Sequence, residues 1–321
     1  MKVYITRRIP SIGISVLEQA GHEVIVSDKD GVLTREELLA ALSEHNPDAV
    51  IPLLTDKIDA EVFDAAPNAK VFATYSVGFG HIDLDAAIER GVTVTNTPGV
   101  LTDTVAEYAS SMICALTKRI PEGDKFTREG LYKGWAPTLL LGSDLKGKIL
   151  GVLGAGRIGS KVAEIMNKGF GMKIIYYDIK ENDFLNSELA ANYYNSVDDV
   201  LKHADVVTVH VPLLDSTHHL LNADRLAMMK PEAYLVNTSR GKVIDESALV
   251  EVLKAGKIKG AALDVFEDEP ILSDGLSELN NVILTPHIAS ATEETRDKMS
   301  QMAAENVIAV LSGTTPVNQI S

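Results

Sequence analysis

Short apolar segments alternate with amphipathic segments along almost the whole chain, and this alternation constrains the fold more than any other feature. The apolar segments have the length of strands, and those between them have the apolar spacing of helices. Such alternation predicts a mostly parallel sheet with helices on both faces. The expected strands cover residues 3–5, 24–26, 49–51, 71–73 and 92–95, then 149–153, 173–177, 206–209, 234–237, 261–263 and 282–284.

The strands fall into two sets, which predicts two α/β domains in the 321 residues. The expected helices cover residues 11–20, 36–45, 60–65, 84–90, 104–118, 160–166 and 292–311. Thr34 with Glu37, and Thr104 with Glu107, have the spacing of capping boxes at two helix starts. Residues 121–147 are expected to be irregular. The last helix follows the second strand set, so we expect it to pack back on the first domain.

Charge and cysteine content exclude several classes of protein. The formal net charge is −15, and no run of like charges offers a local basic patch, so we expect neither a nucleic acid nor a membrane partner. No apolar stretch reaches 18 residues. The single cysteine, Cys114, rules out an intramolecular disulfide and fits a cytoplasmic protein.

A glycine-rich turn stands between the strand at 149–153 and a helix. Gly154, Gly156 and Gly159 form the pattern G-x-G-x-x-G in strand–turn–helix context, which is typical of a dinucleotide-binding site. The next expected strand, at 173–177, is followed directly by Asp178. An acid there accepts hydrogen bonds from the adenosine ribose and repels the 2′-phosphate of NADP, which predicts NAD as the cofactor. Lys180 nearby would weaken that preference.

Three later strands end in side chains suited to hydride transfer. Arg240, an acidic run at 267–269 and His287 follow successive strands, and ligands in open α/β sheets bind beyond the carboxyl ends of strands. His287 is the expected proton donor, and Arg240 the expected clamp for a substrate carboxylate. We choose Glu269 as the acid that supports His287, although spacing also permits Glu267 or Asp268.

The remaining histidines show no partner pattern, apart from His210, which stands at a strand end beside the expected cofactor. His218 and His219 are adjacent, but no cysteine or spaced carboxylate accompanies them. We therefore expect no metal site.

In these residues and motifs the chain resembles the D-isomer-specific 2-hydroxyacid dehydrogenases over nearly its whole length. The resemblance implies a flavodoxin-like substrate domain, residues 1–100 and 288–321, around a Rossmann NAD-binding domain, residues 101–287. It assigns the catalytic roles to Arg240, Glu269 and His287, and selects Glu269 over Glu267. The expected cofactor-binding residues are Gly154, Gly156, Arg157, Ile158, Gly159, Asp178, His210, Val211, Pro212, Thr217, Thr238, Ser239 and Asp264.

Within the family the chain looks most like the glyoxylate/hydroxypyruvate reductases. The loop at 75–83 matches the family's substrate-carboxylate loop, so the backbone N–H groups of Val77 and Gly78 are expected to bind substrate. Trp135 matches a tryptophan that reaches toward the partner subunit's active site, which implies a homodimer; a core position is the alternative for Trp135. Asp178 and Ala289 depart from the subgroup, which often has basic or small residues and glycine there.

The expected reaction is NADH-dependent reduction of a short 2-oxo acid, such as glyoxylate or hydroxypyruvate, to the D-2-hydroxy acid. Hydride would come from nicotinamide C4 and the proton from His287. Two alternatives stay open: a dinucleotide-sensing binding protein similar to the family's corepressors, and a dehydrogenase of a phosphorylated 2-hydroxy acid.

Overall fold

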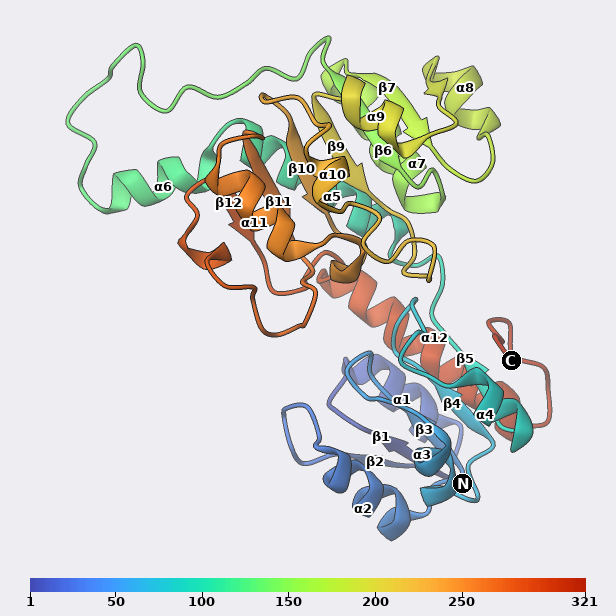
Figure 1. The fold of residues 1–321 in the computed structure, drawn as a ribbon. Helices are drawn as coiled ribbons and strands as arrows, with labels where there is room; N and C mark the ends of the chain where they lie inside the picture. The colour runs from blue at the N-terminus through green and yellow to red at the C-terminus, as the bar shows by residue number, and fades with distance from the viewer. The chain divides into compact units, whose positions relative to one another are not determined.

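The structure, a computed structural model, describes residues 1–321 and divides into two compact units. The first unit holds residues 1–101 and 291–321, and the second holds residues 102–290. Each unit is a sheet with helices packed against it (Figure 1). The first unit is therefore built from both ends of the chain.

The first unit contains a five-stranded parallel sheet with the order β2-β1-β3-β4-β5. This is the flavodoxin-like order, so the predicted fold class is confirmed. The strands are β1 (Lys2–Ile5), β2 (Glu23–Val26), β3 (Ala49–Ile51), β4 (Val71–Ala73) and β5 (Thr93–Thr95). The helices are α1 (Ser11–Gln19), α2 (Arg35–His45), α3 (Ala60–Ala65), α4 (Leu84–Glu89) and α12 (Glu293–Leu311).

Both faces of this sheet are covered. Val3 and Ile5 pack with α1 and α12, whereas Tyr4 between them packs with α2 and α3 on the other face, as the side-chain alternation of a strand requires. A Cβ on Gly13 would collide with Ser300. Glycine at that position therefore allows α1 to lie directly against α12.

The second unit contains a seven-stranded parallel sheet with the order β12-β11-β10-β9-β6-β7-β8. This is the Rossmann order extended by one strand, so the predicted Rossmann fold is confirmed. The strands are β6 (Ile149–Leu153), β7 (Lys173–Tyr177), β8 (Asn192–Tyr193), β9 (Val206–Val209), β10 (Tyr234–Asn237), β11 (Gly260–Leu263) and β12 (Val282–Leu284). The helices are α5 (Thr102–Thr117), α6 (Ile120–Arg128), α7 (Arg157–Phe170), α8 (Asp183–Leu189), α9 (Val197–His203), α10 (Ala223–Leu226) and α11 (Glu246–Lys254).

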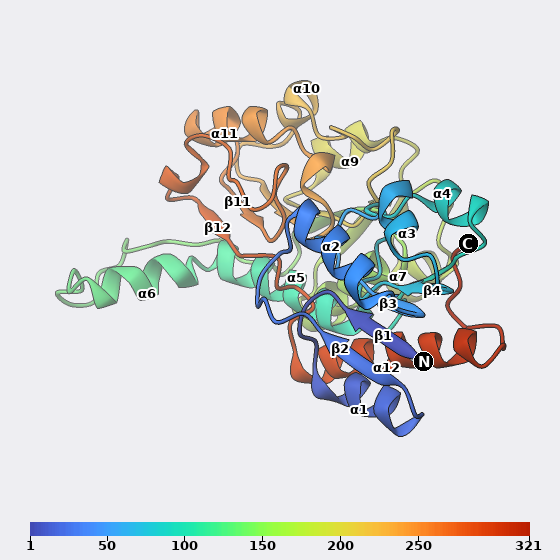
Figure 2. The ribbon, with the colours of Figure 1, turned by 90° about the horizontal axis from the view of Figure 1, so that it is seen from below.

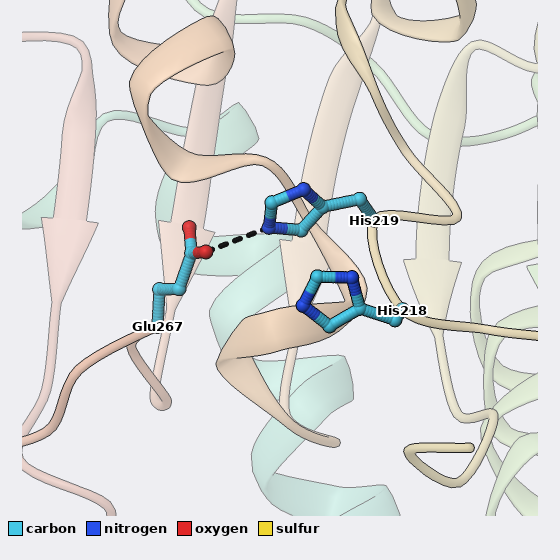
Figure 3. Close-up of side chains that lie close together, drawn as sticks. All are labelled: His218, His219 and Glu267. Atoms are coloured by element: carbon cyan, nitrogen blue, oxygen red, sulfur yellow. Dashed lines mark hydrogen bonds and ion pairs between the residues drawn. The ribbon is translucent and has the colours of Figure 1, made fainter. Parts of the chain in front are cut away.

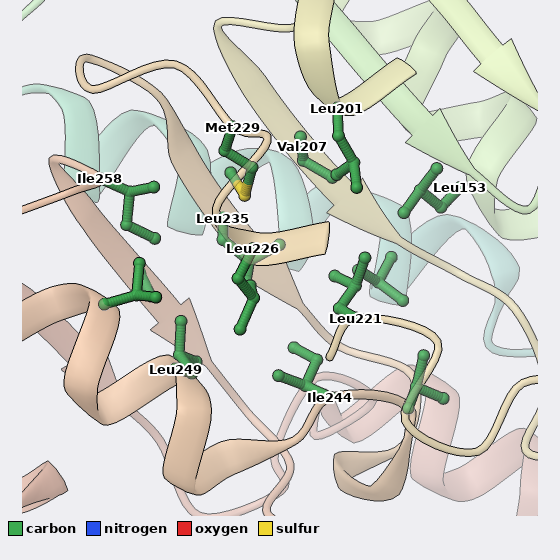
Figure 4. Close-up of a cluster of buried hydrophobic side chains, with 14 of the residues drawn as sticks. Leu153, Leu201, Val207, Leu221, Leu226, Met229, Leu235, Ile244, Leu249 and Ile258 are labelled. Atoms are coloured by element: carbon green, nitrogen blue, oxygen red, sulfur yellow. The ribbon is translucent and has the colours of Figure 1, made fainter. Parts of the chain in front are cut away.

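Its core lies on both faces of the sheet. On one face, Val207 and Leu235 from the central strands pack with Leu201 of α9, Leu226 of α10 and Leu249 of α11 (Figure 4). Neighbouring strand residues point to the other face, where α5, α7 and α8 cover them. Burial on both faces explains why these strands read as continuous apolar runs.

Two local predictions are wrong and one is confirmed. Residues 120–128 form α6, because Arg119, with φ of 57°, ends the preceding helix and Pro121 is tolerated in a first helical turn. Thr104 does not cap a helix, because α5 begins at Thr102 and Thr104 already has helical backbone. The capping box of α2 is present, with the Thr34 side chain accepting from the backbone N–H of Glu37. No helix here combines the length and apolar character needed to cross a membrane.

Candidate active site

The turn after β6 brings the three predicted glycines to the start of α7. Gly154 has φ of 95°, and a Cβ on it would lie 2.7 Å from backbone atoms of His210. A Cβ on Gly159 would collide with the Gly154 carbonyl, so glycine there lets α7 approach β6. Around Gly156 an added Cβ meets nothing within 4 Å, and no side chain caps the helix. The turn therefore offers open space lined by free N–H groups, which fits a pyrophosphate.

Asp178 is held beside this turn by two backbone groups. The N–H of Ala155 donates to its Oδ2 and the N–H of Ile179 to its Oδ1, both at 2.6 Å. A carboxylate oxygen has further lone pairs, so Asp178 can still accept hydrogen bonds from ribose hydroxyls. This arrangement fits an adenosine ribose next to the glycine turn.

Other predicted cofactor residues lie around the same edge of the sheet. Arg157 and Ile158 form the first turn of α7, and His210 and Val211 follow β9 directly. His210 Nε2 lies 2.9 Å from the Thr208 hydroxyl. Burial in the surrounding protein lowers the pKa of His210 to about 3, so the imidazole is neutral at pH 7.

Two threonines differ in how much hydrogen-bonding capacity they leave. The Thr217 hydroxyl donates to the Pro212 carbonyl at 2.6 Å and accepts from the Leu214 N–H at 2.8 Å, so it closes its own loop. The Thr238 hydroxyl, directly after β10, is buried and has no hydrogen-bond partner in the protein. Thr238 therefore has a donor and an acceptor to spare at the cofactor edge.

His287 and Glu269 are joined, although 18 residues separate them in the chain. His287 Nδ1 lies 2.9 Å from Glu269 Oε2, and the Phe266 N–H donates to Oε1 at 3.0 Å. His287 has φ of 54°, an uncommon backbone conformation outside glycine that clusters at functional sites. Partial burial raises the pKa of Glu269, but the hydrogen bond and charge of His287, the Phe266 N–H and Arg240 outweigh it and hold that pKa below its ordinary value.

The turn that carries Arg240 packs against the loop that carries Glu269. Asn237 closes the turn, because its Oδ1 accepts from the Ser239 N–H at 2.9 Å and its Nδ2 donates to the Arg240 carbonyl at 3.0 Å. A Cβ on Gly241 would collide with the Phe266 carbonyl. The absence of a side chain on Gly241 therefore brings the Arg240 turn onto the loop that holds Glu269.

Asp264 faces the loop of His287. Its carboxylate is fully buried and accepts from the Thr285 hydroxyl at 2.7 Å, the Ile288 N–H at 2.9 Å and the Ala289 N–H at 2.8 Å. The Asp264 carbonyl accepts from the His287 N–H at 2.9 Å. Asp264 thus contacts the Thr285 side chain before His287 and the backbone at and after His287, and we infer that its carboxylate supports this loop, a role the sequence did not suggest.

The predicted substrate loop belongs to the first unit. The Val77 carbonyl accepts from Asn96 Nδ2, and the Gly78 carbonyl accepts from the Ser76 hydroxyl, both at 2.7 Å. The backbone N–H groups of Val77 and Gly78 have no acceptor within the protein. Fixed carbonyls with unused N–H groups are what binding of a small carboxylate by backbone requires.

Trp135 is 82% exposed, so the alternative of a core position is wrong. It lies in the segment after α6, which extends away from the rest of the second unit (Figures 1 and 2). No residue of α6 is buried. Leu131, Tyr132 and Leu141 of the same segment are also exposed. The extension therefore carries an exposed apolar surface that includes Trp135.

Sequence reasoning missed the partners of two histidines. His219 Nε2 lies 2.6 Å from Glu267 Oε1, and His81 Nε2 lies 3.0 Å from the Thr74 hydroxyl. Glu267 and His219 are 48 residues apart, so no local spacing signals their contact. Two acids of the run at 267–269 therefore contact different histidines: Glu269 contacts His287, and Glu267 contacts His219.

Known proteins match this chain over nearly its whole length. Residues 110–289 match the family model described as D-isomer specific 2-hydroxyacid dehydrogenase, NAD binding domain. A glyoxylate reductase of Thermofilum pendens is 50% identical over 98% of this chain and 93% of its own. A glyoxylate reductase of Pyrococcus furiosus is 44% identical over 98% of this chain and 94% of its own.

Solved structures share the fold. A protein from Thermus thermophilus has a TM-score of 0.94 and 43% identity, covering 100% of both chains. An NADPH-dependent glyoxylate/hydroxypyruvate reductase from Sinorhizobium meliloti, in complex with NADP and malonate, has a TM-score of 0.85 and 29% identity, covering 100% of this chain and 96% of its own.

Proposed function

The chain belongs to the D-isomer specific 2-hydroxyacid dehydrogenase family and carries its NAD-binding domain, and we propose that it uses NADH to reduce glyoxylate, hydroxypyruvate or a similar short 2-oxo acid. The product is the D-2-hydroxy acid. The observation that carries this proposal is the contact between His287 and Glu269, at 2.9 Å, in the unit that also holds the glycine turn.

The reaction needs one hydride and one proton. Bound NADH supplies the hydride. His287 donates the proton to the carbonyl oxygen from Nε2, because Nδ1–H is engaged by Glu269. Arg240 pairs with the substrate carboxylate through its planar guanidinium. The substrate gains two electrons and two hydrogens and becomes the alcohol.

We assign cofactor binding to the second unit and substrate positioning to the first. Asp178 favours NADH, because its charge opposes the 2′-phosphate of NADPH. The N–H groups of Val77 and Gly78 supply further contacts to the carboxylate. Asp264 is a supporting residue in this scheme rather than a direct cofactor ligand, since its carboxylate is fully buried.

We further propose a homodimer in the cytoplasm. Trp135, 82% exposed, and its apolar neighbours after α6 supply the interface, and Trp135 extends toward the partner subunit's substrate site. Burying aromatic side chains of this kind is the common source of interface stability. The cytoplasmic location rests on the single, half-buried Cys114.

A substrate panel tests the proposed reaction. NADH absorbance is followed with glyoxylate, hydroxypyruvate, pyruvate and a phosphorylated 2-oxo acid, each with wild type and Arg240→Ala. We expect the highest kcat/KM for glyoxylate or hydroxypyruvate, and a large loss in Arg240→Ala. Absence of NADH oxidation with every acid contradicts the proposal. A preference for the phosphorylated acid would instead support a dehydrogenase of a phosphorylated 2-hydroxy acid.

A further inference from the structure

His218, His219 and Glu267 form a side-chain cluster that the proposed reaction does not use. The two histidines lie in the loop between β9 and α10, and Glu267 follows β11. One ligand atom from each residue lies within 4.8 Å of the others. Figure 3 shows both imidazole rings pointing from their loop toward Glu267, which comes from a different segment and faces His219. The cluster thus collects two nitrogens and one oxygen from segments far apart in sequence.

The backbone at His219 explains how two consecutive side chains meet. Consecutive side chains on extended backbone point in opposite directions. His219 has φ of 47°, and this turns its ring onto that of His218, with the ring centroids 4.1 Å apart. The N–H of His219 donates to the Lys242 carbonyl at 2.9 Å, which holds the turn. Left-handed backbone outside glycine is uncommon and clusters at functional sites.

Glu267 is oriented toward the histidines by a second contact. The Glu246 N–H donates to its Oε2 at 3.1 Å, which leaves Oε1 to face His219 Nε2 at 2.6 Å. Lys242, whose carbonyl holds the His219 turn, is paired through its side chain with Asp268 at 3.5 Å. The ring of His218 makes no hydrogen bond and is exposed. A ligand that reaches this ring therefore does not have to break an existing bond.

We propose that these three residues bind a divalent transition metal ion such as Zn²⁺, Co²⁺, Ni²⁺ or Cu²⁺. Imidazole nitrogens and a carboxylate suit these ions better than Mg²⁺ or Ca²⁺, which prefer oxygen ligands alone. Two histidines and one glutamate leave a fourth coordination position for water. Binding replaces the His219–Glu267 hydrogen bond, because the neutral ring shifts its proton from Nε2 to Nδ1, and Nε2 and the carboxylate then both coordinate the ion.

The ion would tie two loops of the second unit together. One loop continues from the predicted cofactor residues Pro212 and Thr217, and the other carries Glu269 two residues after Glu267. The metal ligands exclude Glu269 and His287, so the site is separate from the proposed proton donor. Its occupancy is therefore measurable by direct binding, whether or not the proposed reaction is correct.

The experiment titrates untagged, chelator-treated protein with Cu²⁺ and Co²⁺. Cu²⁺ is followed by electron paramagnetic resonance, where hyperfine coupling counts the coordinated nitrogens, and Co²⁺ by visible absorption. Wild type is compared with His218→Gln, Glu267→Gln and the control His203→Gln. His203 is an exposed histidine of the same unit whose Nδ1 already contacts the Asp199 carbonyl.

We expect one ion per chain with two coordinated nitrogens in wild type and His203→Gln. His218→Gln should leave one nitrogen, and both ligand variants should weaken binding by about tenfold or more. Circular dichroism of the metal-free variants checks that they remain folded. No saturable binding, or binding that His218→Gln and Glu267→Gln leave unchanged, overturns the site and reduces His219–Glu267 to a hydrogen bond between loops.

Discussion

His287 Nδ1 and Glu269 Oε2 lie 2.9 Å apart, and this contact fixes which ring nitrogen can react. The pKa of Glu269 is lowered, so the carboxyl is ionised at neutral pH and can only accept a hydrogen bond. Nδ1 therefore carries a proton in the neutral ring. In the proposed reaction His287 would therefore give substrate the proton on Nε2, and Glu269 would also stabilise the imidazolium before transfer.

Replacing His287 tests the proton donor without changing the backbone. His287 has φ of 54°, and asparagine adopts this conformation readily, so His287→Asn separates the chemistry from the fold. We expect kcat to fall by about 10²- to 10⁴-fold with little change in NADH affinity, measured by fluorescence titration. His203→Gln serves as the control. A kcat close to wild type would remove His287 from the mechanism.

Replacing Glu269 changes both the rate and its pH dependence. Glu269→Gln keeps the shape but loses the charge, so kcat should fall while KM changes less, and the pH profile of kcat/KM should shift. A fall in kcat with little change in KM distinguishes a role in positioning His287 from a role in substrate binding. A variant whose pH profile overlays that of wild type would show that Glu269 does not act through His287.

The same residue makes stability depend on pH. The pKa of Glu269 is lower in the folded chain than its ordinary value, so its ionisation stabilises the fold above the unfolded carboxyl pKa of about 4.3. This contribution is lost as the pH falls through the lower folded value. Urea unfolding at a series of pH values should show that wild type loses more stability on acidification than Glu269→Gln. Parallel curves for the two proteins would contradict this.

Gly241 is predicted to be essential for the approach of two loops. In Gly241→Ala the new Cβ would collide with the Phe266 carbonyl, so the Arg240 turn must move away from Glu269. We expect a loss of about 1–3 kcal/mol or more in the free energy of unfolding and reduced kcat/KM. Gly169→Ala is the matched control, because an added Cβ there meets nothing within 4 Å and alanine favours the helix. Equal effects of the two substitutions would refute the close approach.

Asp178 is predicted to select between the two nicotinamide cofactors. Asp178→Asn retains an oxygen that can accept from the Ala155 N–H but removes the charge that opposes the 2′-phosphate of NADPH. The ratio of kcat/KM for NADPH to that for NADH should therefore rise. An unchanged ratio would mean that another residue sets the preference.

Trp135 is predicted to stabilise a dimer. Its side chain is 82% exposed, and Trp135→Ala removes the largest apolar group of the segment after α6. Sedimentation velocity over a dilution series should show a dimer for wild type and weaker association for the variant. Phe184→Ala, which removes an exposed aromatic side chain on α8, controls for nonspecific effects. A monomeric wild type would contradict the proposal.

Much of the fold could be predicted because its signals are local. The strands from Ile149 to Leu153 and from Tyr234 to Asn237 were predicted at their observed limits, since each is a short apolar run between turns. The two-residue strand β8 was missed because it is too short to show a pattern. The prediction of an irregular segment is wrong at α6, where Pro121 lies in a first helical turn that tolerates proline.

The glycine turn was equally readable, because its three glycines lie within residues 154–159 and follow a strand directly. The role of the acidic run could not be predicted from spacing, which permits Glu267, Asp268 or Glu269 beside His287. The choice of Glu269 depended on the family resemblance. The sequence predicts no metal site at His218 and His219, because no carboxylate lies near them in the chain. The fold brings Glu267 to His219 from 48 residues away.

Two parallel α/β sheets and a dinucleotide turn are predictable from the sequence alone, because apolar periodicity and glycine spacing are signals over short distances along the chain. Which carboxylate contacts which histidine depends on the folded arrangement of the loops. That outcome depends on how the loops after β9, β10, β11 and β12 pack, and on a contact such as Gly241 against Phe266, where the absence of one Cβ sets the separation. Such contacts join residues that no local pattern relates.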